Sequence, residues 1–397
     1  MKKIKEFINT FFGNNSHTFV DEFDGLTISQ RIARDILLNK VCPLDLENSN
    51  VPNNGIDCNS NKAVHAIIIS NFDDIDSELN RLAISLSRQV ALLCHYPNFN
   101  EDNGKNRTKI TVIDSSSNDN LDKIFSRLES ENGNLLKYCP WTMTLFGEST
   151  NKCNETPETY LDVEFNIIGI GNSDIPSCID ALYCENNIIS IFHNNVALPN
   201  YSNKILHEYN LTQYSYDNNV KTDFKRAKLI NMIYSKGINL VQVRGIEDIK
   251  EYNQPIKTYC TYTNWKTINR IWEELPIEHK LSSLFCGDCF ESRIRSSHGN
   301  INESNITKLA YTEHARWNVE KLILGYRPYN KEEKYLDNIS VGQEKIAMRA
   351  NLKKRDKIHI DICSCNDLIR INKEDIKYDF FLTLCIPHIL KREKDNK

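Results

Sequence analysis

Short apolar runs alternate with segments of helical spacing in the first part of the chain. Residues 63–70 (AVHAIIIS) form a continuous apolar run of strand length, and apolar residues in 74–93 then recur at the 3.6-residue spacing of a helix. The other expected elements are strands at 110–114, 163–170, 188–192 and 238–243 (INLVQV) and a helix at 121–128. Alternating strands and helices predict an α/β fold with a mainly parallel sheet.

The pattern becomes helical in the last third of the chain. Helices are expected at 265–274, 277–295 and 308–324. Residues 46–62, rich in Asn, Pro and Gly, and the polar stretch 299–305 are interpreted as linkers or breaks. The expected organisation is an N-terminal helix and linker (1–60), a sheet domain (61–255), a helical connector (256–299) and a small, mostly α-helical domain (300–397).

The N-terminal segment has the pattern of an amphipathic helix. Its apolar residues follow helical spacing at Ile4, Phe7, Ile8, Phe11 and Phe12. Glu6, Asn9 and Thr10 interrupt any apolar core of a signal peptide, so secretion is not indicated. Docking on the body of the protein, on a partner or on a membrane surface remains open.

Charge and hydropathy exclude several classes of protein. The 49 basic and 53 acidic residues give a formal net charge of -4, which provides no general attraction to nucleic acid. No window approaches the roughly 20 apolar residues of a membrane-spanning helix. The basic clusters at 353–355 and 391–392 are interpreted as solvated faces. We expect a soluble cytoplasmic protein with no nucleic-acid partner and no transmembrane segment.

The cysteines indicate a reducing compartment rather than a metal centre. They number 13 and are scattered through apolar segments, as expected for buried free thiols. Cys286 and Cys289 have the spacing of half a zinc site, but neither His298 nor the pair Cys363 and Cys365 completes a standard second half. No metal is expected.

A candidate cofactor site lies at the carboxyl ends of the expected strands. In a dinucleotide-binding sheet, an acidic residue at the end of the second strand binds the ribose, and glycines let the backbone approach a phosphate. Asp114 occupies the acidic position, and Gly169 and Gly171 form a flexible turn after the third strand. Residues 61–255 are therefore expected to be Rossmann-like.

The turn after the first strand departs from this pattern. Residues 70–74 (SNFDD) contain no glycine, and their two carboxylates would repel a pyrophosphate. We interpret Asp73 and Asp74 as caps of the following helix. The turn at Gly169 and Gly171 is either a simple tight turn or a place where a phosphate approaches.

The segment 309–328 (LAYTEHARWNVEKLILGYRP) contains the strongest candidate binding site. On a helix, a core stripe is formed by Ala315, Val319, Leu322 and Ile323. A different side carries His314, Trp317, Asn318 and Lys321. An indole beside an imidazole, an amide and an ammonium suits stacking on a ring and contact with an anionic group. Packing of Trp317 against a neighbouring helix is the alternative. Gly325 is expected to end the helix and to place Arg327 near the same mouth.

This run resembles the signature helix of ryanodine-receptor (RyR) domains, which in prokaryotic members reads His-x-Arg-Trp-x-x-x-Lys, followed by Gly and an aromatic residue. The matching residues are His314, Arg316, Trp317, Lys321, Gly325 and Tyr326. The stretches 291–296 and 359–368 are similar to flanking parts of bacterial relatives, in which the RyR module often follows a TrkA-N-like Rossmann domain.

The resemblance implies ligand recognition by residues 300–397 and does not imply catalysis. In bacteria such domains occur beside nucleotide-signalling and phage-conflict genes. The candidate ligand-binding residues are His314, Arg316, Trp317, Asn318, Lys321, Tyr326 and Arg327.

Three functions remain open from the sequence. The first is a soluble sensor of a nucleotide-derived ligand, in bacterial signalling or anti-phage defence. The second is a nucleotide- or NAD-dependent enzyme with Asp114 on the ribose and the turn at Gly169 and Gly171 near phosphate. No nucleophile–base pair, metal set or hydride-transfer constellation in the sequence supports it. The third is a regulatory subunit that docks on a membrane effector, or forms a homo-oligomer, through the N-terminal helix.

Overall fold

The computed structural model describes residues 25–47, 54–116, 120–148, 151–171, 173–199, 206–214, 222–243, 264–372 and 375–395. The expected N-terminal helix and part of the expected linker at 46–62 lie outside these residues.

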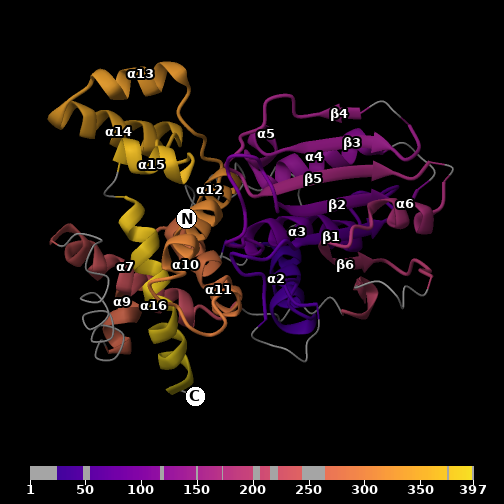
Figure 1. Cartoon of the computed structure of the whole chain (residues 1–397), viewed down its shortest axis with the longest axis horizontal. Coiled ribbons are helices and arrows are strands. Elements are labelled where there is room, and N and C mark those ends of the chain that lie inside the picture. Colours follow the sequence, from indigo (N-terminus) through magenta and orange to yellow (C-terminus); the bar gives the residue numbers. More distant parts are fainter. Residues whose placement is uncertain are drawn as a thin grey trace.

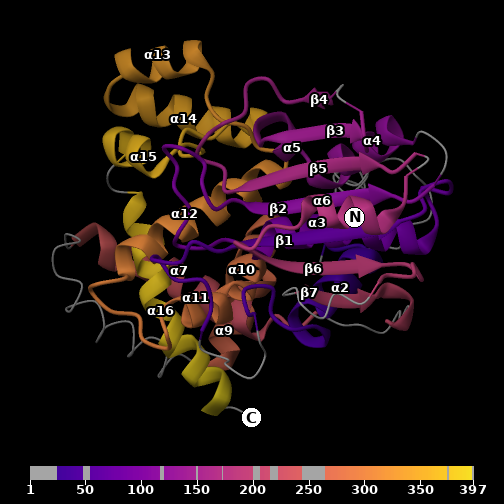
Figure 2. The ribbon, with the colours of Figure 1, turned by 45° about the vertical axis from the view of Figure 1, so that its right-hand side comes forward.

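Seven strands of the described residues form one sheet. They are β1 (Ala63–Ser70), β2 (Thr108–Asp114), β3 (Trp141–Leu145), β4 (Asn151–Cys153), β5 (Val163–Gly169), β6 (Asn187–His193) and β7 (Leu206–Asn210). Their order is β4-β3-β5-β2-β1-β6-β7 (Figure 2), and every neighbouring pair is parallel except β3 and β4. From β1 the chain passes to β2, then to the antiparallel pair β3 and β4 at the far edge, returns to β5 between β2 and β3, and then crosses to β6 on the other side of β1. The expected α/β fold with a mostly parallel sheet is confirmed.

The helices form layers around this sheet (Figure 1). Those that follow or precede strands are α2 (Ile28–Asp35) with its π-helical extension η1 (Ile36–Lys40), α3 (Glu78–Leu93), α4 (Leu121–Asn132), α5 (Leu135–Tyr138), α6 (Ile175–Leu182) and the 3₁₀ turn η2 (Leu211–Gln213). Those beside the sheet are α7 (Lys225–Val243), α9 (Trp265–Glu273), α10 (Ile277–Asp288), α11 (Phe290–Ser296), α12 (Ile306–Ile323), α13 (Lys331–Ile339), α14 (Gly342–Asp356), α15 (Cys365–Asn372) and α16 (Ile376–Asp395). Helices α13 to α15 lie together at one end of this helical region.

The central strands are buried on both faces, which explains their unbroken apolar runs. In β1, Val64, Ala66 and Ile68 belong to the hydrophobic cluster that includes α2, α3 and α4, whereas Ile67 and Ile69 belong to the cluster that includes α6. Successive side chains of a strand point to opposite faces, so a strand between two layers is apolar at most positions, and a buried polar residue such as His65 is paired, here with Thr111 Oγ1 at 2.8 Å.

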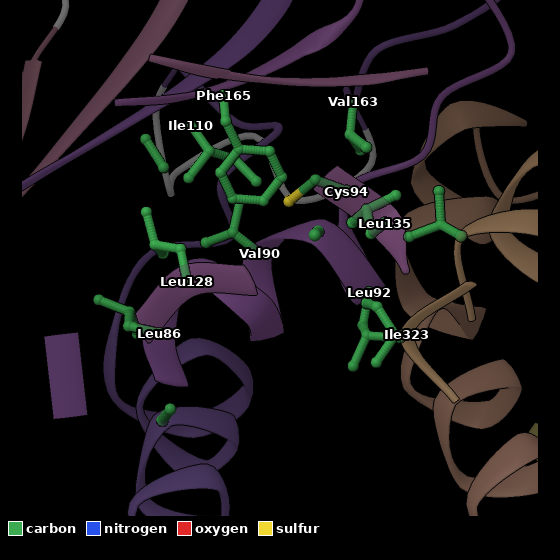
Figure 3. Packing of buried hydrophobic residues seen from close by; sticks show 14 of the residues in the cluster. Leu86, Val90, Leu92, Cys94, Ile110, Leu128, Leu135, Val163, Phe165 and Ile323 are labelled. Atoms are coloured by element: carbon green, nitrogen blue, oxygen red, sulfur yellow. The ribbon is translucent and has the colours of Figure 1, made fainter. Parts of the chain in front are cut away.

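Helix α12 joins the helical region to the sheet layer. Its Val319, Leu322 and Ile323 belong to the same hydrophobic cluster as Leu92 of α3 and Leu135 of α5. Figure 3 shows Ile323 beside Leu92. Burial of each such side chain contributes roughly 1.5–3 kcal/mol. The sheet and α12 therefore share one core.

The expected strand at 238–243 is wrong. These residues are the last part of α7, which begins at Lys225 and passes through Gly237 without a break. Periodicity does not distinguish a short apolar run of strand length from a segment of a buried helix.

The expected capping by Asp73 and Asp74 is also wrong. Helix α3 begins only at Glu78, and its N-cap is Ser77, whose Oγ accepts a hydrogen bond from the Asn80 backbone N–H at 3.3 Å. The two aspartates lie in the preceding turn instead.

Several elements have no counterpart in the sequence prediction. They are α2, α5, β3, β4, α6, β7 and most of α7, and the helices α13 to α16 lie in the region expected to be helical but had no predicted bounds. Helix α2 begins with a capping box: Thr27 Oγ1 accepts from Gln30 N at 3.2 Å, and Thr27 N donates to Gln30 Oε1 at 3.1 Å. Residues of α2 enter the main core, so the segment before the sheet contributes to its stability.

Gly133, which follows α4, allows the close approach of α12. Its φ is +59°, and a Cβ there would lie 2.5 Å from the Ile323 carbonyl oxygen and 2.8 Å from that of Leu322. The next residue, Asn134, donates its backbone N–H to Leu322 O at 2.9 Å. A side chain at position 133 would thus separate the two layers where they hydrogen-bond.

We predict that Gly133→Ala lowers the free energy of unfolding by about 3 kcal/mol, because it adds a steric overlap to an unfavourable backbone conformation. The matched control is Gly171→Ala, where φ is +56° but the space around a Cβ is open; it should lose about 1 kcal/mol. Urea denaturation followed by circular dichroism measures both. Equal losses in the two variants would contradict the close approach.

Candidate ligand-binding site

Helix α12 ends in the turn that the sequence predicts at Gly325. The φ of Gly325 is +83°, its N–H donates to Leu322 O at 3.0 Å, and the Tyr326 N–H donates to Lys321 O at 2.9 Å. This pair of bonds is a Schellman motif, which reverses the chain at the end of a helix. The Tyr326 ring is thereby placed over α12, with its centroid 5.7 Å from Lys321 Nζ.

A cavity of about 510 Å³ lies beside this end of α12. Its walls come mainly from α7, α10, α12, α14, α16 and residues 358–361. The volume falls in the range of small-molecule pockets, roughly 300–1,000 Å³. Five of the predicted binding residues line it, namely His314, Arg316, Trp317, Lys321 and Tyr326. Asn318 and Arg327 lie outside its walls.

Trp317 is the centre of an aromatic wall. The ring of His314 stacks on it at a centroid distance of 5.9 Å and an angle of 17°, and His359 meets it edge-on at 5.0 Å and 82°. Burial lowers the pKa of His359 to about 3, so this imidazole is neutral at physiological pH. Trp317 is only partly buried, and the rest of its surface faces the cavity.

Lys321 places a cation over this wall. Its Nζ lies 5.6 Å from the Trp317 ring centroid and forms an ion pair with Glu320 at 2.8 Å. An ammonium over an indole face is attracted by the ring quadrupole. Trp317 and Lys321 therefore share one side of α12, as the sequence predicts, and that side lines a cavity.

Arg316 is part of a buried ionic network rather than an open binding group. It is 1% exposed and contacts Glu313 at 2.8 Å and Glu320 at 2.6 Å. Burial alone would raise the pKa of Glu320, but Lys321 and Arg316 lower it to about 2. Buried charges are stable only when paired in this way, so the guanidinium is committed to structure.

His314 and Asn318 both hold the opposite wall of the cavity. His314 Nε2 lies 3.0 Å from the carbonyl oxygen of Cys363, and Asn318 Nδ2 donates to the same oxygen at 2.8 Å. His314 Nδ1 lies 3.2 Å from Asp379 of α16. Burial disfavours the imidazolium, but the hydrogen bonds to Asp379 and Cys363 and the charge of Asp379 together outweigh it, and the pKa of His314 is raised to about 10. Both residues position the 359–363 segment.

Arg327 points to α13 instead of the cavity. Its guanidinium contacts Glu333 at 2.6 and 2.8 Å. Its backbone bridges to the 357–359 segment, since Arg327 N donates to Lys357 O at 2.9 Å and Arg327 O accepts from His359 N at 3.0 Å. Arg327 was expected to lie near the same mouth of the cavity as Lys321. Its backbone does lie in the turn at that end of α12, but its guanidinium points away from the cavity.

Several lining residues were not predicted from the sequence. They are contributed by other helices and include Tyr234, His279, Arg349, Lys353 and Tyr378. The sequence interpretation placed Lys353 in a solvated basic cluster, and the residue is exposed as well as lining the cavity. Its i, i+4 spacing with Arg349 on α14 was the available signal, but only the fold shows that this face of α14 meets α12 across a cavity.

Asp114 is fully occupied within the protein. It is 1% exposed and accepts hydrogen bonds from Phe72 N (3.1 Å), Ser116 N (3.0 Å), Ser116 Oγ (2.8 Å) and Asn120 Nδ2 (3.4 Å). A carboxylate offers about four acceptor positions. The geometry gives Asp114 the role of fixing the turns after β1 and β2, and leaves no acceptor for a ribose hydroxyl.

The two glycines of the candidate cofactor site have local structural roles. A Cβ at Gly169 would lie 2.9 Å from Leu145 Cδ2, so a side chain there would displace the Leu145 side chain of β3. Gly171 adopts a left-handed φ of +56° in an open turn. The turn after β1 is closed by Asn80, whose Nδ2 donates to Asn71 O at 2.7 Å and Asp74 O at 2.6 Å.

The cysteines of the half zinc site are buried. The Cys289 thiol donates to Leu92 O at 3.4 Å, and burial raises the pKa of both Cys286 and Cys289. Over the described part of the chain, no group of three or more His, Cys, Asp or Glu side chains is arranged to hold a metal ion.

Comparison of the chain with models of protein families, with curated proteins and with solved structures finds no match. Among the helices of the described residues, none combines the length and apolar character needed to cross a lipid bilayer.

We predict that Asp114→Ala lowers the free energy of unfolding by about 2–4 kcal/mol, because it leaves buried donors such as the Phe72 N–H without an acceptor. Asp122→Ala is the control: this exposed carboxylate pairs with Lys152 at the surface, and its loss should change stability by less than about 1 kcal/mol. Chemical denaturation measures both. Wild-type stability of Asp114→Ala would contradict its structural role.

The ion pair between His314 and Asp379 predicts a pH-dependent stability. Because the folded state raises the pKa of His314 to about 10, the contribution is complete below about pH 6.5, the ordinary pKa of histidine, and is lost as pH rises towards 10. At pH 6.5, His314→Gln should lose about 3–5 kcal/mol. Denaturation at pH 6.5, 8 and 9.5 should show the gap to wild type narrowing, whereas a constant gap would exclude the imidazolium.

Proposed function

We propose that this chain is a sensor that binds a nucleotide-derived small molecule in the cavity beside α12. The observation that carries the proposal is that Trp317 and Lys321 project from one side of α12 into a space of about 510 Å³. The other side of the same helix is packed into the core.

The chemistry of the cavity supports a ligand with a ring and an anionic group. The indole of Trp317 and the imidazole of His359 offer aromatic surface for a base, since stacking accepts every nucleobase. Lys321 and Lys353 offer ammonium groups for phosphate. Tyr326 completes the aromatic surround of Lys321.

Binding is favoured over catalysis by the state of the reactive groups. The Cys286 thiol lines the cavity, but burial raises its pKa well above the ordinary value, so it stays protonated and weakly nucleophilic. At the sheet edge, Asp114 has its acceptor positions filled by the protein. A nucleotide-processing role at that edge therefore cannot use Asp114 as an open acid.

We further propose that residues 61–255 are a TrkA-N-like Rossmann domain and 300–397 an RyR-like domain, in a cytoplasmic protein of bacterial signalling or anti-phage defence. Support for the first comes from the sheet, whose order reverses at β1, as in doubly wound nucleotide-binding folds. Support for the second is the resemblance of the α12 sequence together with the cavity at its end.

We predict that purified protein binds at least one of AMP, 3′,5′-cyclic AMP and ADP-ribose, and that Trp317→Ala weakens binding about tenfold or more through loss of stacking. Isothermal titration calorimetry measures the affinities. The matched control is Trp265→Ala, because Trp265 is flanked by Lys225 and Arg392 but lies outside this cavity. Absence of binding to all three probes, or equal affinity of the Trp317 variant, would sink the proposal.

A further inference from the structure

The walls of the cavity carry both signs of charge. Besides the imidazolium of His314, four basic side chains line it, Arg316, Lys321, Arg349 and Lys353, and four carboxylic ones, Glu278, Asp361, Asp375 and Asp379. A count of charges therefore does not by itself identify the ligand. The charges available to a ligand depend on where each charged group lies and on whether another group of the protein already neutralises it.

Most of these charges are engaged by the protein itself. Arg316 and Lys321 contact Glu320, Arg349 contacts Asp337 at 2.6 Å, Glu278 contacts Lys357 at 2.8 Å, and Asp379 contacts His314 at 3.2 Å. These pairs neutralise the wall. Lys353 differs from them, because it makes no ion pair with any residue that the structure describes, although it lies within electrostatic range of Lys321 and Asp361.

Asp361 and Asp375 form a second distinct feature, a pair of hydrogen-bonded carboxyl groups. Asp361 is 9% exposed. Burial, together with the neighbouring Asp361, raises the pKa of Asp375 to about 7. Two carboxyl groups this close share a proton, so the pair presents both donor and acceptor oxygens to the cavity.

A carboxyl pair of this kind matches adjacent hydroxyl groups. Each hydroxyl of a ribose both donates and accepts, and acidic side chains are the groups that dinucleotide-binding sheets use to hold ribose. In this chain the acid at the sheet edge, Asp114, already accepts hydrogen bonds from the protein. The cavity beside α12 contains the same chemistry, next to an indole and an ammonium.

We propose that the ligand is a ribonucleotide with a free ribose diol, held at three points: its base on Trp317, its phosphate at Lys353 with Lys321, and its diol on Asp361 and Asp375. This inference rests on the proposed function and narrows it to one class of nucleotide. It excludes 3′,5′-cyclic nucleotides and deoxynucleotides as the preferred ligands.

The diol contact is tested by pairs of probes that differ only in the ribose hydroxyls. AMP is compared with 2′,3′-dideoxy-AMP, and ADP-ribose with its 2′-deoxy counterpart on the adenosine side, by calorimetry on the full chain. Wild type should bind the member of each pair that has the diol about tenfold more tightly than the deoxy member. This ratio is the effect expected from losing a hydrogen bond to a charged group. Asp361→Asn and Asp375→Asn should reduce this ratio towards one.

The ratio separates recognition from damage to the fold, because a misfolded cavity weakens both members of a pair equally. Asp367→Asn, at an exposed pair with Arg370, is the matched acidic control and should keep the wild-type ratio. Lys353→Gln should weaken AMP about tenfold relative to adenosine and leave the diol ratio unchanged. The exposed neighbour Lys354→Gln should change neither.

The outcomes distinguish this inference from the proposed function. If no nucleotide probe binds, both fail. If nucleotides bind in a Trp317-dependent way but the diol ratio is near one, or 3′,5′-cyclic AMP binds more tightly than AMP and ADP-ribose, the function stands and the diol contact is wrong. A ratio that Asp361→Asn and Asp375→Asn leave unchanged would also overturn it.

Discussion

The burial of Arg316 between Glu313 and Glu320 sets the orientation of α12, on which both the core and the cavity depend. All three charges lie within two turns of one helix, and breaking a buried pair costs about 3–5 kcal/mol. Any rotation of α12 would carry the three charges together out of their buried position. With the network in place, Leu322 faces the sheet core and Trp317 faces the cavity. The buried ionic network of Arg316 thus fixes both the contact of α12 with the core and the side of α12 that lines the cavity.

The far wall of the cavity is held from the same helix. His314 and Asn318 both bond the Cys363 carbonyl, and His314 also reaches Asp379 of α16. These residues resemble binding groups in the sequence because they are polar and share a side with Trp317. In the structure they act indirectly, because they position the segment that contributes His359 to the cavity. Their contribution to affinity under the proposed function is therefore indirect.

Sequence patterns predicted the features that depend on neighbouring residues in the chain. They failed for features that depend on contacts with other segments. The buried runs of β1 and β6 and the end of α12 at Gly325 follow from composition and spacing. The charge of Arg327 was misplaced because its partner, Glu333, belongs to the next helix. Lys353 is exposed, as predicted, but its place in the cavity wall was missed because the spacing within α14 does not show that this face meets α12.

The sheet contributes to the cavity without supplying a lining residue from its carboxyl edge. Asn134, which follows α4, donates through Nδ2 to the carbonyl oxygens of Gly325 and Tyr326 at 2.8 and 3.0 Å. These bonds fix the turn that places Tyr326 over Lys321. At the edge where open α/β sheets usually bind ligands, the carboxylate of Asp114 is engaged by its own hydrogen bonds. Under the proposed function, the sheet supports the cavity and the helices that it positions carry the recognition.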